Sequence, residues 1–232
     1  MLDRYSITAT AKKLAERFSV DVPEGYSPRY NAAPSQLLPV ITTDSPGGVS
    51  FFYWGIAPGW AKNKSISERI INQRADQLPE RPSVLKTLKK RRCVVPADGF
   101  YGWKKVSKRS TIPYRFTLAS KSIFSFPALW EEYDDEEGNF FHTFTIITLP
   151  ANQLVAPTSE TMPAILDEAA EKNWLDKNTS ESDLLKLLSP LSHEALHNYT
   201  ISPQIYLLSN DRPSLILPAP PSDQFGNLTL FD

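Results

Sequence analysis

The sequence predicts an α+β fold in which one domain holds most of the 232 residues. Short runs of β-branched and aromatic residues recur along the chain, bounded by Pro, Gly, Asn and Asp, as strands usually are. Helical patterns are few and do not alternate with these runs, which argues against repeated βαβ units. A hydrophobic content of 41% is enough for a sizeable core. We therefore expect a single β-rich domain of antiparallel or mixed sheets.

The expected elements follow in chain order. A first helix is capped by Ser6 or Thr8 and places Ala11, Leu14 and Phe18 on one face. Strands are expected at residues 37–43, 50–54, 93–95, 114–118 and 140–148. Further helices are expected at residues 82–90, 167–177 and 181–188. The basic end of the helix at 82–90 suits a helix C-terminus, and a DNA contact there is the alternative.

The chain ends in a segment rich in proline. It begins at Leu217 and reads L-P-A-P-P-S-D-Q-F-G, a composition typical of an extended tail. We therefore expect the domain to span residues 1–216 and a flexible tail to span residues 217–232.

Composition limits the function only loosely. The 25 basic and 26 acidic residues nearly cancel, so a nucleic-acid surface would have to be a local patch. A single cysteine, Cys93, cannot form an internal disulfide, and neither a secretory pattern nor a membrane-spanning apolar run is present. We expect a cytoplasmic protein, associated with the nucleoid when bound to DNA. Without a P-loop, a dinucleotide fingerprint or metal-ligand spacing, no cofactor and no metal are expected.

Four segments carry the strongest functional signal. They are R-Y-N-A-A-P at 29–34, W-G-I-A-P-G-W at 54–60, I-N-Q-R at 71–74 and R-R-C-V-V-P-A-D-G-F-Y-G-W-K-K at 91–105. In this order and spacing they resemble the SOS-response-associated peptidase (SRAP) family of abasic-site processing proteins. The likeness continues through F-P-A-L-W-E, T-I-I-T, L-V-A-P and M-P, ending with M-P at residues 162–163.

The resemblance implies a compact SRAP-like domain with a barrel-like core, flanking helices and a cleft for single-stranded DNA. In this family a cysteine that follows the initiator methionine cross-links to an abasic site in the DNA damage response. Its α-amino group forms a Schiff base with the sugar aldehyde and its thiol closes a stable ring, while a Glu and a His assist.

This chain departs from the family pattern at each of these reactive positions. The family's Met-Cys-Gly-Arg start reads Met1-Leu2-Asp3-Arg4 here, and Leu2 should also block removal of Met1. Gly102 replaces the Glu, and Ser159 replaces the His. We therefore expect a DNA-binding pseudoenzyme without cross-linking. The alternatives are an abasic-site lyase that uses the amine of Met1, and a scaffold without DNA.

The residues expected to contact single-stranded or junction DNA survive better. Arg4, Asn31, Asn72 and Arg74 match family positions, and Trp60 is a candidate for base stacking, as is Trp54. The alternatives are burial for the tryptophans, internal ion pairs for the arginines and a turn cap for Asn72.

Two other groups of residues complete the expectations. Cys93 should be a buried, inert thiol, and the three histidines should be surface or structural residues. The last residues resemble the Q-L-S/D-L-F peptide that docks in the bacterial sliding clamp, with its positions taken by Asn227, Leu228, Leu230 and Phe231. The alternative is a tail that packs on its own domain.

Overall fold

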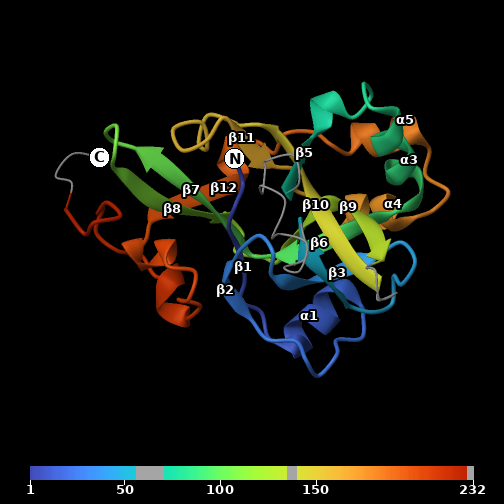
Figure 1. Ribbon diagram of the computed structural model, residues 1–232, viewed down its shortest axis with the longest axis horizontal. Coiled ribbons are helices and arrows are strands. Elements are labelled where there is room, and N and C mark those ends of the chain that lie inside the picture. The colour runs from blue at the N-terminus through green and yellow to red at the C-terminus, as the bar shows by residue number, and fades with distance from the viewer. Residues whose placement is uncertain (56–70, 135–139, 229–232) are drawn as a thin grey trace.

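The computed structural model describes residues 1–55, 71–134 and 140–228, which form two β-sheets side by side (Figure 1). The larger sheet contains β3 (Leu37–Thr42), β4 (Ser50–Trp54), β5 (Asn72–Arg74), β6 (Arg92–Ala97), β9 (Phe124–Asp134), β10 (Phe140–Pro150) and β11 (Thr161–Pro163). The smaller sheet contains β1 (Tyr5–Ile7), β2 (Arg29–Ala32), β7 (Gly99–Lys105), β8 (Thr111–Leu118) and β12 (Leu196–Thr200).

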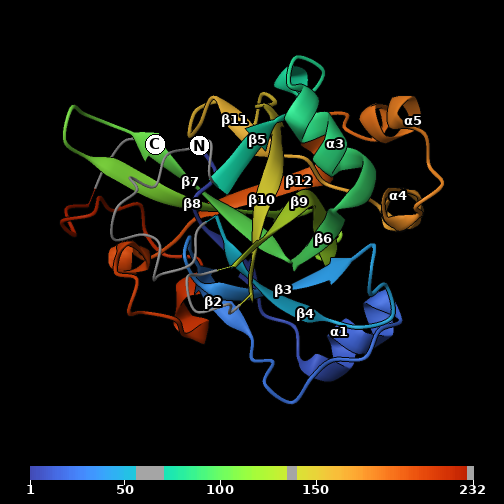
Figure 2. The same ribbon diagram turned by 45° about the vertical axis from the view of Figure 1, so that its right-hand side comes forward.

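The larger sheet closes into a barrel. β3 pairs with β4 and β6, β9 pairs with β6 and β10, and β10 returns to pair with β4 in parallel. This ring leaves none of its strands with an open edge. Large apolar side chains such as Trp54, Phe126 and Phe144 are fully buried, as expected for a core of this kind. The predicted barrel-like α+β domain is confirmed (Figure 2).

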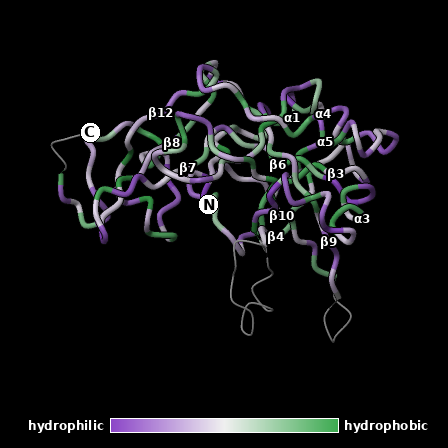
Figure 3. Tube along the Cα trace, turned by 90° about the horizontal axis from the view of Figure 1, so that it is seen from above, coloured by the Kyte–Doolittle hydropathy of each residue, from purple (hydrophilic) through white to green (hydrophobic). Residues whose placement is uncertain are grey.

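The smaller sheet begins where the barrel ends, because β6 runs into β7 with only Asp98 between them. Its strand order is β12-β8-β7-β1-β2, which places the N-terminal strand inside the sheet. In Figures 1 and 3 the start of the chain accordingly lies between the barrel and the outer part of the smaller sheet.

The helices lie on the outside of the barrel. They are α1 (Ala11–Phe18), α3 (Pro82–Lys90), α4 (Glu168–Leu175) and α5 (Glu181–Lys186), close to the predicted ranges. The predicted cap of α1 was wrong: Thr10 is the N-cap, and its hydroxyl accepts a hydrogen bond from the backbone N–H of Lys13. No helix in the described part of the chain is both long and apolar enough to cross a membrane.

A buried arginine joins α3 and α4. The side chain of Arg92 donates hydrogen bonds to four backbone carbonyls, at distances of 2.6–2.9 Å. The acceptors lie at the C-terminal ends of the two helices, where carbonyl groups lack helical partners and the helix dipole is negative: Leu88, Lys89, Trp174 and Asp176. The cation therefore caps both helices at once.

The proline-rich segment differs from the predicted flexible tail over residues 217–228, because these residues pack on the smaller sheet. Ala219 exchanges two hydrogen bonds with Thr200, at 3.0 and 2.7 Å. Asp223 is 4% exposed and accepts a hydrogen bond from Ser110, and Gln224 accepts one from the backbone N–H of Thr111. Hydrogen bonds, and not the burial of large apolar side chains, hold this segment on the smaller sheet. Its proline-rich composition therefore did not predict the contact.

Candidate functional site

The N-terminal strand is held by the D-G-F-Y segment. The carboxylate of Asp98 accepts hydrogen bonds from the hydroxyls of Ser6 and Thr8, at 2.7 and 2.6 Å, and from Arg115 at 2.9 Å. Gly99 is required beside this cluster, since a Cβ there would lie 2.7 Å from the Nε atom of Arg115. These residues fix where the chain begins.

The N-terminal residues come together with two of the family positions. The α-ammonium of Met1 donates a hydrogen bond to the hydroxyl of Ser159 at 2.6 Å. The side-chain amide of Asn72 donates one to the carbonyl of Leu2, also at 2.6 Å. The side chain of Leu2 is buried, at 2% exposure. Residues that are 70 and 158 positions apart in sequence thus meet at one place.

Gly102 lies in this region, but the space for its side chain is already filled. A Cβ atom built there would lie 2.8 Å from Thr158 Cβ and 2.9 Å from Phe116 Cε2, with Thr158 Oγ1 closer still. Thr158 is held in place by a 2.9 Å hydrogen bond to the carbonyl of Val155. A glutamate therefore cannot simply be restored at position 102.

Three buried side-chain oxygen atoms on β5, β10 and β11 have no hydrogen-bond partner in the described part of the chain. They are Asn72 Oδ1, Thr148 Oγ1 and Thr161 Oγ1, on residues that are 4%, 1% and 6% exposed. Paired residues of adjacent strands share a face, and Arg74 pairs with Thr148 while Thr161 pairs with Pro150. Arg74 and Asn72 are two apart in β5, so all of them lie on one face of the sheet. Buried polar atoms without partners are costly and often mark a ligand site.

Both candidate arginines are paired with carboxylates of the chain itself. Arg74 forms two hydrogen bonds to Asp76, at 3.0 and 2.6 Å, and these lower the pKa of Asp76. Arg4 donates a 2.7 Å hydrogen bond to the backbone carbonyl of Asp3, and its Nη1 atom lies 3.9 Å from the carboxylate of Asp3. Burial lowers the pKa of Arg4, and Asp3 partly opposes this shift. Both arginines therefore form ion pairs within the chain, which was the alternative to a DNA contact.

Asn31 is placed in the interior. It is 0% exposed, and its amide nitrogen donates hydrogen bonds to three backbone carbonyls, those of Ile205, Leu207 and Asn210, at 3.0–3.2 Å. In this arrangement the amide anchors the C-terminal part of the chain. A direct contact between Asn31 and DNA would require that segment to move.

Of the two aromatic candidates, Trp54 lies within the described residues. Trp54 is 0% exposed and packs against Tyr5 and Phe144, so the burial alternative is confirmed for it. Trp60 lies outside the described residues. Sequence reasoning missed the half-buried Trp103, which donates a 2.9 Å hydrogen bond to Asp3 and lies with its ring centroid 5.0 Å from that of Tyr206. The sequence signal that could have revealed this contact was Asp3 itself, because the family pattern has Gly at that position.

The predictions for cysteine and histidine agree with the structure. Cys93 is fully buried, and burial raises the pKa of its thiol far above the usual range. His142 stacks on Phe52 and contacts Glu132, while His193 and His197 are exposed.

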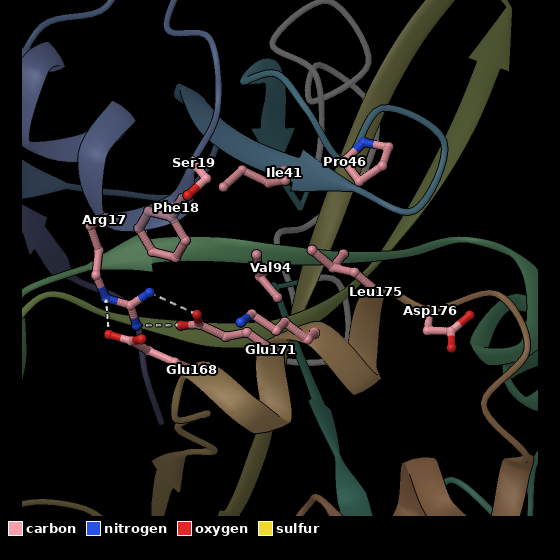
Figure 4. Close-up of a pocket in the computed structure, with 11 residues that line it drawn as sticks. Arg17, Phe18, Ser19, Ile41, Pro46, Val94, Glu168, Glu171, Leu175 and Asp176 are labelled. Atoms are coloured by element: carbon pink, nitrogen blue, oxygen red, sulfur yellow. Dashed lines mark hydrogen bonds and ion pairs between the residues drawn. The ribbon is translucent and has the colours of Figure 1, made fainter.

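A separate cavity of about 380 Å³ lies between α1 and α4 (Figure 4). Three of its charged groups are paired with one another, since Arg17 binds Glu171 through two hydrogen bonds of 2.9 Å and lies 3.6 Å from Glu168. None of the family positions within the described residues lines this cavity. The candidate site is therefore the group of residues around the chain start.

The chain is similar to several known proteins. A family model described as "SOS response associated peptidase (SRAP)" matches residues 1–207. "Abasic site processing protein YoqW" from Bacillus subtilis is 38% identical over 221 residues, covering 93% of this chain and 99% of that protein. "Abasic site processing protein YobE" from the same organism is 37% identical, covering 87% and 94%. A crystal structure of a protein from Bacteroides thetaiotaomicron matches with a TM-score of 0.79 at 28% identity, covering 93% and 99%.

Proposed function

Because the chain belongs to the SOS response associated peptidase family, we propose that it acts in abasic-site processing by binding single-stranded or junction DNA without cross-linking to it. The relatives named as abasic site processing proteins support the first part of this proposal. The second part rests on three residues that depart from the family pattern. Leu2 replaces the cysteine that carries the thiol, Gly102 replaces the glutamate and Ser159 replaces the histidine.

The remaining chemistry suits binding better than covalent reaction. Leu2 offers no thiol to close a ring, and neither Gly102 nor Ser159 can exchange a proton near neutral pH. Arg4, Asn72 and Arg74 remain at the cleft as donors for phosphate and sugar oxygens. Among the other family positions, Trp60 is kept as the proposed stacking residue. Asn31 would support the cleft from the interior.

A binding and trapping experiment on one oligonucleotide tests this proposal. The protein is titrated with labelled single-stranded DNA containing one abasic site, at several salt concentrations, and a sample is then boiled in denaturant. We expect salt-dependent binding and no adduct that survives boiling. Arg74→Ala should weaken binding by about 1.5–3 kcal/mol and reduce the salt slope by about 0.7. Lys177→Ala, a change at an exposed lysine that pairs with Asp44, is the matched control.

One observation favours a second candidate function, an abasic-site lyase. The Met1 amine lies 2.6 Å from the hydroxyl of Ser159, the residue at the position of the family's His. As a neutral amine it could add to the sugar aldehyde, and loss of water would then give an imine. Borohydride would reduce that imine to a stable secondary amine. A borohydride-dependent adduct would therefore support the lyase, and its absence together with DNA binding would support the non-covalent protein.

We also propose the sliding clamp as a partner for the end of the chain. Leu228 is 68% exposed, whereas the amide of Asn227 donates a hydrogen bond to Asp223 at 3.2 Å. Leu230 and Phe231 lie outside the described residues. A peptide spanning residues 222–232 should bind the cognate clamp with micromolar affinity, and Leu230→Ala with Phe231→Ala should abolish binding. No binding at near-millimolar clamp concentrations would leave the segment as part of the domain.

A further inference from the structure

We propose that Asp3 sets the affinity of the cleft for nucleic acid, because its carboxylate holds the place beside Arg4 that a phosphate group would take. This inference rests on the proposed DNA-binding function and names the residue that limits it. The case begins with Arg4 and its unused capacity for hydrogen bonds.

Arg4 is a cation with too few partners. Its side chain is 16% exposed, and its Nε atom is buried without a hydrogen-bond partner in the described part of the chain. The partners of its Nη1 atom both belong to Asp3: the backbone carbonyl at 2.7 Å and, more weakly, the carboxylate at 3.9 Å. A guanidinium can donate five hydrogen bonds, and the described residues provide an acceptor at hydrogen-bond distance for one of them. Such a group favours an anion that can accept hydrogen bonds at short range.

The carboxylate of Asp3 disfavours the binding of such an anion to Arg4. Its Oδ1 atom accepts a 2.9 Å hydrogen bond from the indole N–H of Trp103, whose ring packs against Tyr206. Its Oδ2 atom faces Arg4 at 3.9 Å, too far for a hydrogen bond but close enough to offset the charge. A phosphate on Arg4 would bring a second anion beside this carboxylate, and the two would repel each other.

The backbone around Asp3 keeps the carboxylate in place. The preceding residue, Leu2, is buried, and its carbonyl accepts a hydrogen bond from Asn72. The carbonyl of Arg4 accepts a 3.2 Å hydrogen bond from the backbone N–H of Tyr101, which continues the pairing of β1 with β7. Asp3 therefore cannot move away from Arg4 without breaking the contact to Trp103 or one of these backbone bonds.

Removal of the charge alone provides the test. Asp3→Asn keeps an oxygen that can accept the Trp103 hydrogen bond but carries no charge. Full-length wild-type and Asp3→Asn proteins are titrated with the same abasic single-stranded oligonucleotide at low and moderate salt. We expect Asp3→Asn to bind on the order of tenfold more tightly at low salt. Its salt slope should be steeper by about 0.7, as for one added phosphate contact.

Three further variants separate this effect from others. Asp44→Asn removes an exposed carboxylate that pairs with Lys177, so it makes the same change in net charge and should leave binding unchanged. Asp3→Gly, which restores the residue of the family pattern, should also bind more tightly. In an Arg4→Gln background, Asp3→Asn should give no gain, because the two residues act as a pair. Thermal unfolding of each variant shows that it is folded.

The possible results of these titrations lead to different conclusions. The inference is supported if Asp3→Asn binds more tightly than the wild type and this gain is lost in the Arg4→Gln background. The same holds if the wild type binds too weakly to measure and Asp3→Asn binds measurably. Equal binding by the wild type and Asp3→Asn overturns the inference but leaves the DNA-binding function in place. Absence of binding by both proteins overturns the inference and the proposed function together.

Discussion

Introducing a side chain at position 102 should lower the free energy of unfolding, whatever its effect on a reaction. In Gly102→Ala the new Cβ atom would lie 2.8 Å from Thr158 Cβ and 2.9 Å from Phe116 Cε2, well inside normal contact distance. Phe116 cannot easily yield, since it is fully buried and stacks on Phe100 with ring centroids 5.0 Å apart. Overpacking of this kind costs about 1–3 kcal/mol. For a domain of this size, each kcal/mol lowers the melting temperature by about 2–4 °C.

Urea unfolding of Gly102→Ala and Gly102→Glu measures this cost as a shift of the midpoint at constant slope. Thr158→Gly removes two of the three atoms that the new Cβ would meet and leaves Phe116 Cε2, so it should recover part of the loss when combined with Gly102→Ala. The double-mutant cycle gives this coupling directly, without the separate cost of the Thr158 change. An unchanged midpoint for Gly102→Ala would mean that Thr158 moves freely, and the argument from filled space would then fail.

Three other predictions follow from buried groups. Cys93 should react with a thiol reagent only on unfolding, and a native-state rate close to that of a free thiol would contradict its placement in the core. Burial raises the pKa of Cys93 and of Tyr5, so the unfolded chain releases these protons first; stability should fall by about 1.4 kcal/mol per pH unit above about pH 8.5 because of Cys93, and by about the same amount again above about pH 10 because of Tyr5. Arg92→Lys should cost on the order of 2 kcal/mol in urea unfolding, because an ammonium cannot reach the four carbonyls of two helix ends.

The sequence predicted the helices and several strands because their signals are local, but it did not predict β9 (Phe124–Asp134), which is as long as β10. The strands at 37–42, 50–54, 111–118 and 140–150 are rich in β-branched and aromatic residues, and their existence was expected from composition alone. β5 and β7 were not predicted as strands, since N-Q-R is short and polar and G-F-Y-G-W contains two glycines. These strands form because neighbours far away in sequence supply their hydrogen bonds.

The candidate site was predicted only through the family resemblance. Met1 and Ser159 are 158 residues apart, and no periodicity or spacing links them. The resemblance named the positions that meet, but it could not show that Thr158 fills the space beside Gly102. Nor could it show that each predicted arginine is paired with an aspartate nearby in the chain. Those facts depend on side-chain packing, which differs between relatives of one fold.

Retention of the D-G-F-Y segment is therefore weak evidence for retained chemistry. Asp98 ties together β1 and β8, Gly99 leaves room for Arg115, and Tyr101 donates a hydrogen bond to the carbonyl of Tyr30. Each of these contacts positions the start of the chain, whatever residue stands there. A chain in which Leu2 and Gly102 depart from the family pattern still uses these contacts to position its first strand. The same scaffold presents Asp3 and Arg4 at the start of the chain, so the proposed binding can be tested separately from any covalent reaction.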